Sequence, residues 1–177
     1  MAFFAYRFFF GKVPDKRIFD NYLRSRHLMG AALVVLAANY AVHLCVDIRQ
    51  IDVNGAIVMN LTTYFFSYGL FVAALHTLLN CSFISRKIIA RHCLLWLLYA
   101  ILSVVVLVFV KDGLIEDVLI HFLGLILALY GFILAARLLK SYHRAVKMMN
   151  NTHSDNIAAY VRWMSVLTYW MLIFGIS

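Results

Sequence analysis

The fold is decided by Leu94-Leu-Trp-Leu-Leu-Tyr-Ala-Ile-Leu-Ser-Val-Val-Val-Leu-Val-Phe-Val110, a run without a single charge. It reaches the length of about 17–25 apolar residues that a helix needs to cross the hydrocarbon core of a bilayer. It shows none of the alternation expected of a membrane-spanning β-strand. Because lipid offers no partner to an exposed backbone amide, such a run is expected to be an α-helix.

Similar runs occur along the chain, at about 27–46, 56–80, 93–110, 117–139 and 157–177. The whole chain is 64% hydrophobic and 14% charged, whereas soluble domains have about 45–50% and 25%. A soluble fold of this size could not bury that much apolar surface. The sequence therefore predicts an all-α fold, a polytopic membrane bundle of five transmembrane helices that forms one domain over 27–177.

The N-terminal segment 1–26 differs from the rest. Its apolar stretch, Ala2 to Phe10, is too short to span and contains Arg7, and the residues after it are mostly polar and basic. The order of charge and apolar residues also differs from that of a cleavable signal peptide. We expect a cytoplasmic or interfacial segment in which aromatic rings lie at the membrane surface beside arginine.

Charge in the connections predicts the orientation. Basic connections (1–26, 81–92 and 137–156) alternate with connections in which acidic residues outnumber basic ones (47–55 and 111–116). The positive-inside rule then places the N-terminus in the cytoplasm, and five spans would leave Ser177 outside. The basic residues expected at the cytoplasmic membrane surface, where they attract anionic lipids, are Arg24, Arg26, Arg86, Lys87, Arg91, Arg137, Lys140, Arg144 and Lys147.

Polar residues within spans are costly and usually face the bundle interior or a cavity. Six of them lie near the predicted outer surface on three helices: Asn39, His43, Asp47, Asn60, Asp117 and His121. They could line a shallow ligand pocket open to the outside, in which the histidines titrate near neutral pH. Alternatively, they could simply hydrogen-bond between helices. They are too few converging ligands to predict a metal site.

Other polar and small residues have weaker signals. His76 and His92 lie near the predicted cytoplasmic boundary, where an interfacial role is expected. Gly124 and Ala128 form a small-xxx-small pair that could seat a neighbouring helix. No nucleotide-binding loop, nucleophile elbow or paired carboxylate site occurs, so the sequence predicts neither an enzyme nor a cofactor.

Three segments together resemble the N-terminal membrane module of Bacteroidetes-type membrane-bound regulators: 150–165, the Tyr22–Arg26 segment with the span that follows it, and 60–67. Members of that family carry a cytoplasmic output, either an AraC-like helix-turn-helix domain or a histidine kinase. The resemblance implies a bacterial inner membrane protein that reaches nucleic acid only through such an output. No output domain is present here, and a further span after Ser177 would be expected to precede one.

The leading hypothesis is therefore a non-catalytic sensory or anchoring module of a transcriptional regulator or signalling protein, with an unknown small-molecule ligand. One alternative is a small channel or transporter subunit, which would require a homo-oligomer. Another is an accessory protein that recruits cytoplasmic partners through its basic surface.

Overall fold

The computed structural model describes residues 1–11, 20–79, 86–110 and 113–152, together with Val166 and Tyr169. Its elements are α1 (Ala2–Phe10), α2 (Asp20–Val46), α3 (Ile48–Ile51), α4 (Val53–Leu79), α5 (Arg86–Phe109) and α6 (Gly113–Thr152). Within these ranges every regular element is a helix, which confirms the all-α prediction.

Four of the helices, α2, α4, α5 and α6, are long and apolar enough to cross a membrane. They correspond to the first four predicted spans, whereas the fifth, 157–177, lies outside the described residues except for Val166 and Tyr169. By length and composition the chain is thus a transmembrane protein. The helices also run past the apolar stretches: α2 begins at Asp20 and α5 at Arg86, within predicted basic connections. Lys and Arg are good helix formers, so a helix continues where its hydropathy has already fallen.

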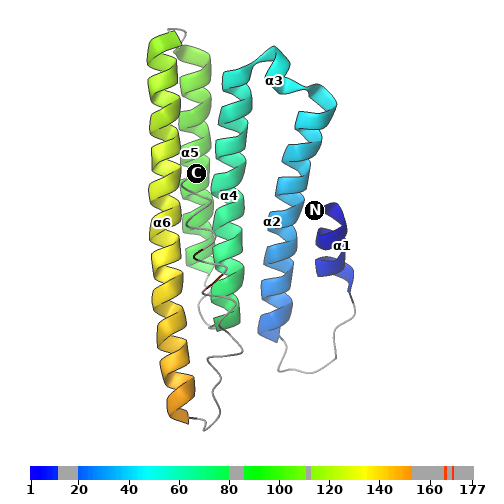
Figure 1. Cartoon of the computed structure of the whole chain (residues 1–177), viewed down its shortest axis with the longest axis vertical. Helices are drawn as coiled ribbons and strands as arrows, with labels where there is room; N and C mark the ends of the chain where they lie inside the picture. The colour runs from blue at the N-terminus through cyan, green and yellow to red at the C-terminus, as the bar shows by residue number, and fades with distance from the viewer. Residues whose placement is uncertain (12–19, 80–85, 111–112, 153–165, 167–168, 170–177) are drawn as a thin grey trace.

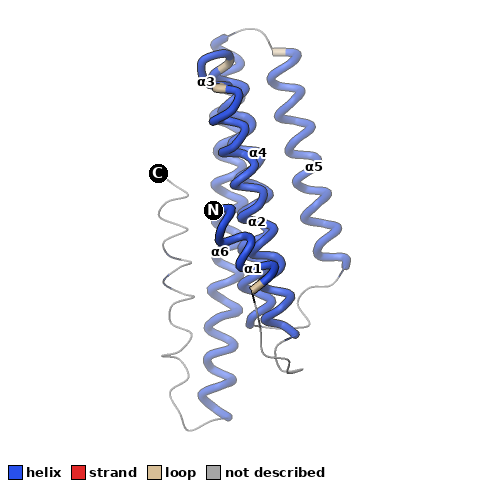
Figure 2. Tube along the Cα trace, turned by 90° about the vertical axis from the view of Figure 1, so that its right-hand side faces the viewer, coloured by secondary structure: helices blue, strands red, loops and turns tan. Residues whose placement is uncertain are grey.

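The four long helices alternate in direction and form an antiparallel bundle (Figure 1). One end of the bundle holds α3, and we call it the α3 end. The other holds the start of α2, the C-terminus of α4, the start of α5 and the end of α6, and we call it the basic end (Figure 1). Helix α4 lies at the centre because it contacts α2, α3, α5 and α6, while α5 stands to one side of the others (Figure 2).

Two apolar clusters hold α4, α5 and α6 together. The first joins all three helices and centres on Phe65, whose ring stacks between those of Tyr99 and Tyr130 with centroids 4.5 and 4.0 Å away. The second lies nearer the basic end and packs Leu75 of α4 against Leu138 of α6. Polar groups add specific contacts, since the buried Tyr99 hydroxyl donates to the Leu123 carbonyl at 3.0 Å.

The connection at the α3 end is tightly determined. Asp47 adopts a left-handed backbone conformation (φ 49°, ψ 44°), which ends α2. Asp52 then begins α4, because its Oδ1 accepts a hydrogen bond from the Gly55 backbone N–H at 2.9 Å, as an N-cap residue does. The predicted non-basic connection 47–55 therefore contains a short helix and a capped helix start.

The N-terminal helix α1 packs along the lower part of α2 (Figure 1). Arg26, predicted as a cation at the membrane surface, is instead buried in this contact: its Nη2 donates to the carbonyls of Arg7 and Gly11, both at 2.7 Å. The carbonyls at the C-terminus of α1 carry the negative end of the helix dipole and attract a cation, which explains the difference. The axis of α1 follows that of α2 and does not run across the bundle.

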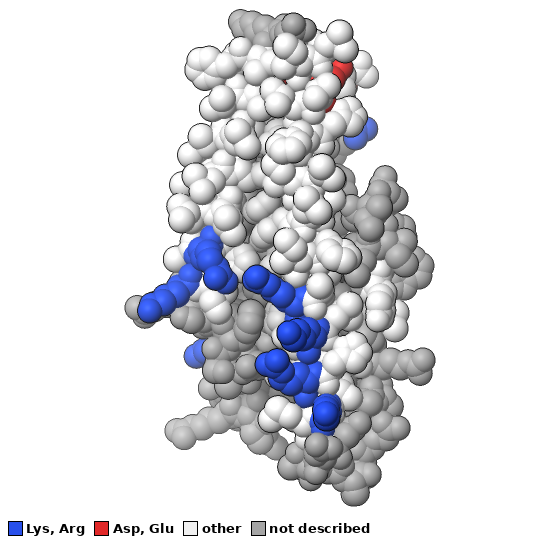
Figure 3. Space-filling model, turned by 90° about the vertical axis from the view of Figure 1, so that its left-hand side faces the viewer, with Lys and Arg blue, Asp and Glu red and all other residues white. Residues whose placement is uncertain are grey.

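The charges divide between the ends. On the face seen in Figure 3, Lys and Arg side chains gather toward the basic end, and the acidic side chains in view lie near the α3 end. Described cations with exposed side chains at the basic end are Arg24, Lys87, Arg91, Arg137, Lys140, Arg144 and Lys147. The side chain of Arg86 lies outside the described set. Which end faces the cytoplasm remains a prediction.

Candidate functional site

Near the α3 end, three of the six predicted site residues meet between α2 and α4. The amide of Asn39 and Nε2 of His43 both donate to Oδ1 of Asn60, at 2.7 and 2.8 Å. The Thr63 hydroxyl completes the group by donating to Oδ1 of Asn39 at 3.3 Å. We call these four residues the α2–α4 polar cluster. The i, i+4 spacing of Asn39 and His43 brings both to one acceptor on the neighbouring helix.

The other three predicted residues lie apart from this cluster. Asp47 is exposed in the turn that ends α2. Asp117 and His121 are exposed on α6, where Nδ1 of His121 donates to the Asp117 carbonyl at 2.7 Å. The polar contact that α6 makes with α4 at this end is a different one, in which Nδ2 of Asn54 donates to Glu116 Oε1 at 3.0 Å.

The geometry of the α2–α4 polar cluster favours the interhelical reading of these residues. Asn39 is only 5% exposed, and its amide nitrogen and oxygen each have a partner within the cluster. Interhelical hydrogen bonds of this kind contribute about 0.6 to 2 kcal/mol each in membrane proteins. Ligand binding by the six predicted residues remains a prediction.

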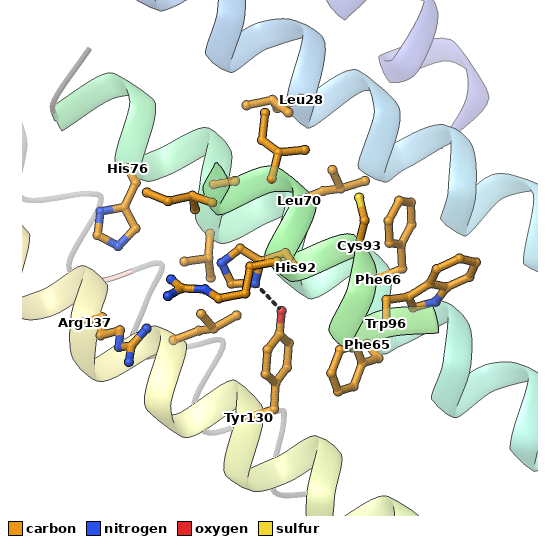
Figure 4. A pocket seen from close by; sticks show the side chains of 17 residues that line it. Leu28, Phe65, Phe66, Leu70, His76, His92, Cys93, Trp96, Tyr130 and Arg137 are labelled. Atoms are coloured by element: carbon orange, nitrogen blue, oxygen red, sulfur yellow. Dashed lines mark hydrogen bonds between the residues drawn. The ribbon is translucent and has the colours of Figure 1, made fainter. Parts of the chain in front are cut away.

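A second site lies toward the basic end, where a cavity of about 100 Å³ opens between α4, α5 and α6, with Leu28 of α2 at its edge. We call it the basic-end cavity. Figure 4 shows its two sides: His76, His92 and Arg137 gather on one side, and the rings of Phe65, Phe66 and Trp96 lie on the other. Arg91 also lines the cavity.

Tyr130 of α6 connects the two sides of this cavity. Its hydroxyl is hydrogen-bonded to Nδ1 of His92 at 3.1 Å, and its ring stacks on Phe65 (Figure 4). Gly69 permits this position, because a Cβ there would lie only 3.0 Å from the Tyr130 hydroxyl oxygen. Small residues at helix contacts are a common feature of membrane bundles.

Trp96 fixes the aromatic side of the cavity. Its indole N–H donates to the Thr62 carbonyl at 3.1 Å, and its ring packs against Phe66 with centroids 4.9 Å apart. The wall formed by α5 is therefore held in register with α4. The predicted small-xxx-small contact is not part of it, because a Cβ at Gly124 would meet nothing within 4 Å among the described residues.

The residues that line the cavity combine cationic groups with an apolar wall, as an anion-binding site does. Two guanidinium groups and two imidazoles line it. The carboxylates whose side chains are described, Asp47, Asp52, Glu116 and Asp117, all belong to helix ends at the α3 end. Within the described part of the chain, no group of three His, Cys, Asp or Glu side chains is placed to hold a metal ion.

The sequence predicts only an interfacial role for His76 and His92 and surface charges at Arg91 and Arg137. A signal for a shared site is nevertheless present, because all four residues lie at similar depths near the basic ends of three predicted spans. Only the packing of α5 against α4 and α6 shows that these side chains share one cavity.

Comparison of the chain with protein-family models, with curated proteins and with solved structures finds no match.

Proposed function

We propose that the chain is the membrane-embedded sensory or anchoring module of a signalling protein or transcriptional regulator, non-catalytic as it stands, in a bacterial inner membrane. The observation that supports it best is the length of α6. This helix runs without interruption for 40 residues, about 60 Å at 1.5 Å per residue. The hydrocarbon core is about 30 Å thick, so α6 extends well beyond it.

The projecting part of α6 carries the charges that would meet the cytoplasm. Arg137, Lys140, Arg144 and Lys147 are exposed along it, while Leu138 and Tyr142 on the same stretch are buried against α4. This charged stretch is thus a continuous part of the helix that contains the fourth predicted span. Helices α4 and α6 both run from the α3 end to the basic end, so a shift at one end can reach the other as a rigid-body movement.

A sensory role requires that a stimulus bind two helix arrangements with different affinity. The α2–α4 polar cluster is the best candidate for the element that changes, because it fixes the position of α2 on α4 near the α3 end. Breaking the cluster by substitution can therefore stand in for the unknown stimulus.

The test uses electron–electron distance measurements on the full chain in lipid nanodiscs. The native cysteines Cys45, Cys81 and Cys93 are replaced, and spin labels are placed at two exposed basic-end positions, Arg24 on α2 and Lys147 on α6. Asn60→Leu is expected to shift the distance distribution between the labels, whereas Ile57→Leu, at an exposed position one turn away on α4, is expected to leave it unchanged.

Identical distributions for both variants would contradict the sensory role and leave anchoring as the function. Ion flux through liposomes that contain the purified protein would contradict both and favour the channel alternative.

A further inference from the structure

The basic-end cavity is amphipathic in a way that the proposed function does not use. Its cationic side consists of Arg91 and Arg137, with the imidazoles of His76 and His92 beside them, and its apolar side is built largely from Phe66, Leu70 and Trp96 (Figure 4). Arg91 and Arg137 are also exposed, so the cationic side is accessible from the surroundings of the bundle.

The positive charge of this cavity has no counter-charge among the described side chains. No described carboxylate forms an ion pair with Arg91 or Arg137, and the acidic residues with described side chains belong to the opposite end of the bundle. Two guanidinium groups beside a low-dielectric wall raise the local potential, which attracts an anion from outside the protein. Arginine is also the side chain best suited to bind phosphate oxygens in pairs.

The size and lining of the cavity restrict the anion further. A volume of about 100 Å³ is the share of liquid volume of roughly three waters. It can admit a few methylene groups, but not a whole acyl chain, and the aromatic wall offers no hydrogen bonds to a free anion. A ligand that satisfies both sides carries an anionic head and an apolar chain, most of which would lie along the outside of the helices.

We propose that the basic-end cavity is a binding site for a phospholipid with an anionic head group. The phosphate lies between Arg91 and Arg137, and the first part of the chain packs against Phe66 and Trp96. Basic pockets between transmembrane helices bind anionic lipid head groups in this manner. Binding at this site is specific, unlike the general attraction of anionic lipids to a basic surface. The proposal does not depend on a sensory role of the protein.

The test is quenching of Trp96 fluorescence by lipids with brominated chains, in the full chain with Trp163 and Trp170 replaced by Phe. Trp96 lies ten residues after Arg86, where α5 starts, or about 15 Å along the helix. A bromine atom in the middle of a lipid acyl chain can therefore reach the Trp96 side chain. Vesicles contain brominated phosphatidylglycerol or brominated phosphatidylcholine in about 0.15 M salt, where the Debye length is only about 8 Å.

Phosphatidylglycerol is expected to quench at a mole fraction roughly 30-fold lower than phosphatidylcholine, which is the strength typical of two arginines near an anionic bilayer. Arg91→Gln with Arg137→Gln should abolish this preference, and Arg91→Lys with Arg137→Lys should keep much of it. Lys140→Gln with Lys147→Gln is the matched control, because it removes the same charge from exposed positions of α6 that do not line the cavity.

An equal loss of lipid preference in the Arg91→Gln, Arg137→Gln variant and in the Lys140→Gln, Lys147→Gln control would overturn the site and leave only diffuse electrostatic attraction. Displacement of the lipid by inorganic phosphate at similar concentration would also overturn it, because the site would then bind the anion alone. Native mass spectrometry of the unmodified chain provides a second measurement: retention of phosphatidylglycerol over phosphatidylcholine supports the proposal, and equal retention contradicts it. This readout does not depend on whether the double variants fold.

Discussion

Polar side chains have opposite surroundings at the two ends of the bundle. At the α3 end, Asn39, His43 and Asn60 satisfy one another between α2 and α4. At the basic end, Arg91 and Arg137 line a cavity without any described carboxylate beside them. Helix α4 runs through both regions, so the contrast does not come from different helices.

This contrast shows two uses of polar residues within one membrane bundle. A closed set of hydrogen bonds stabilises the contact between two helices and leaves little for a ligand to gain. A set of like charges at an apolar wall destabilises the empty bundle and gains from a counter-charge supplied by the surroundings. The α3 end is therefore expected to matter for stability and the basic end for binding.

The largest effect expected concerns the orientation of the two ends. In a cysteine-free background, a single cysteine at Ile51 in α3 should react with an impermeant thiol reagent added outside intact bacterial cells. A single cysteine at Lys147 in α6 should react only after the inner membrane is opened. Both positions are exposed, so labelling reports the side of the membrane. The reverse pattern would invert the positive-inside prediction.

At the α3 end, Asn60→Leu removes the acceptor shared by Asn39 and His43. Leaving two donors without a partner should lower the free energy of unfolding by about 1–3 kcal/mol. The measurement is denaturant-induced unfolding in detergent micelles, followed by circular dichroism.

Thr62→Val provides the control for this loss. The Thr62 hydroxyl donates to the Val58 carbonyl within α4, and no hydrogen bond from this hydroxyl to another helix occurs among the described residues. Its replacement should change stability by less than about 0.5 kcal/mol. Equal losses in the two variants would show that the cluster does not stabilise the α2–α4 contact.

At the basic end, Tyr130→Phe removes the hydrogen bond to His92 but keeps the ring that stacks on Phe65. Because His92 is only partly buried, water or a head group can replace the bond, and the loss should stay below about 1 kcal/mol. Tyr99→Phe, which deprives the buried Leu123 carbonyl of its side-chain donor, should cost more in the same unfolding assay. A larger loss for Tyr130→Phe would show that neither water nor a head group replaces the bond to His92.

The smallest effects expected separate two glycines with opposite surroundings. A Cβ at Gly30 of α2 would lie 2.8 Å from the Phe9 ring, so Gly30→Ala should loosen α1 and speed amide hydrogen exchange in Ala2–Phe10. A Cβ at Gly124 would meet nothing within 4 Å. Gly124→Ala should therefore leave exchange in α1 unchanged and raise stability by up to about 0.8 kcal/mol through helix propensity. Faster exchange in both variants would contradict this assignment.

Much of the fold could be predicted from local sequence. The four long helices lie where the apolar runs predicted them, since backbone groups in lipid require a helix wherever such a run is long enough. The separation of charges between the bundle ends is likewise a property of the connections. Helix boundaries were less predictable, because a helix extends beyond its apolar run. Helices α2 and α5 begin at Asp20 and Arg86, before the apolar runs start.

The sites required the tertiary structure. Sequence spacing placed Asn39, His43 and Asp47 on one face, but Asp47 leaves that face because its backbone ends the helix. Depth along the span suggested that His121 could join His43, yet the rotation of α6 about its axis leaves His121 exposed.

A membrane bundle of helices with charge divided between its ends follows from the amino-acid sequence alone, because hydropathy and charge act residue by residue along the chain. Which polar side chains meet depends on the tertiary structure. The rotation of each helix depends on packing between distant residues, such as Phe65 against Tyr130 and Gly69 beneath the Tyr130 hydroxyl. That packing brings His76, His92 and Arg137 to one cavity.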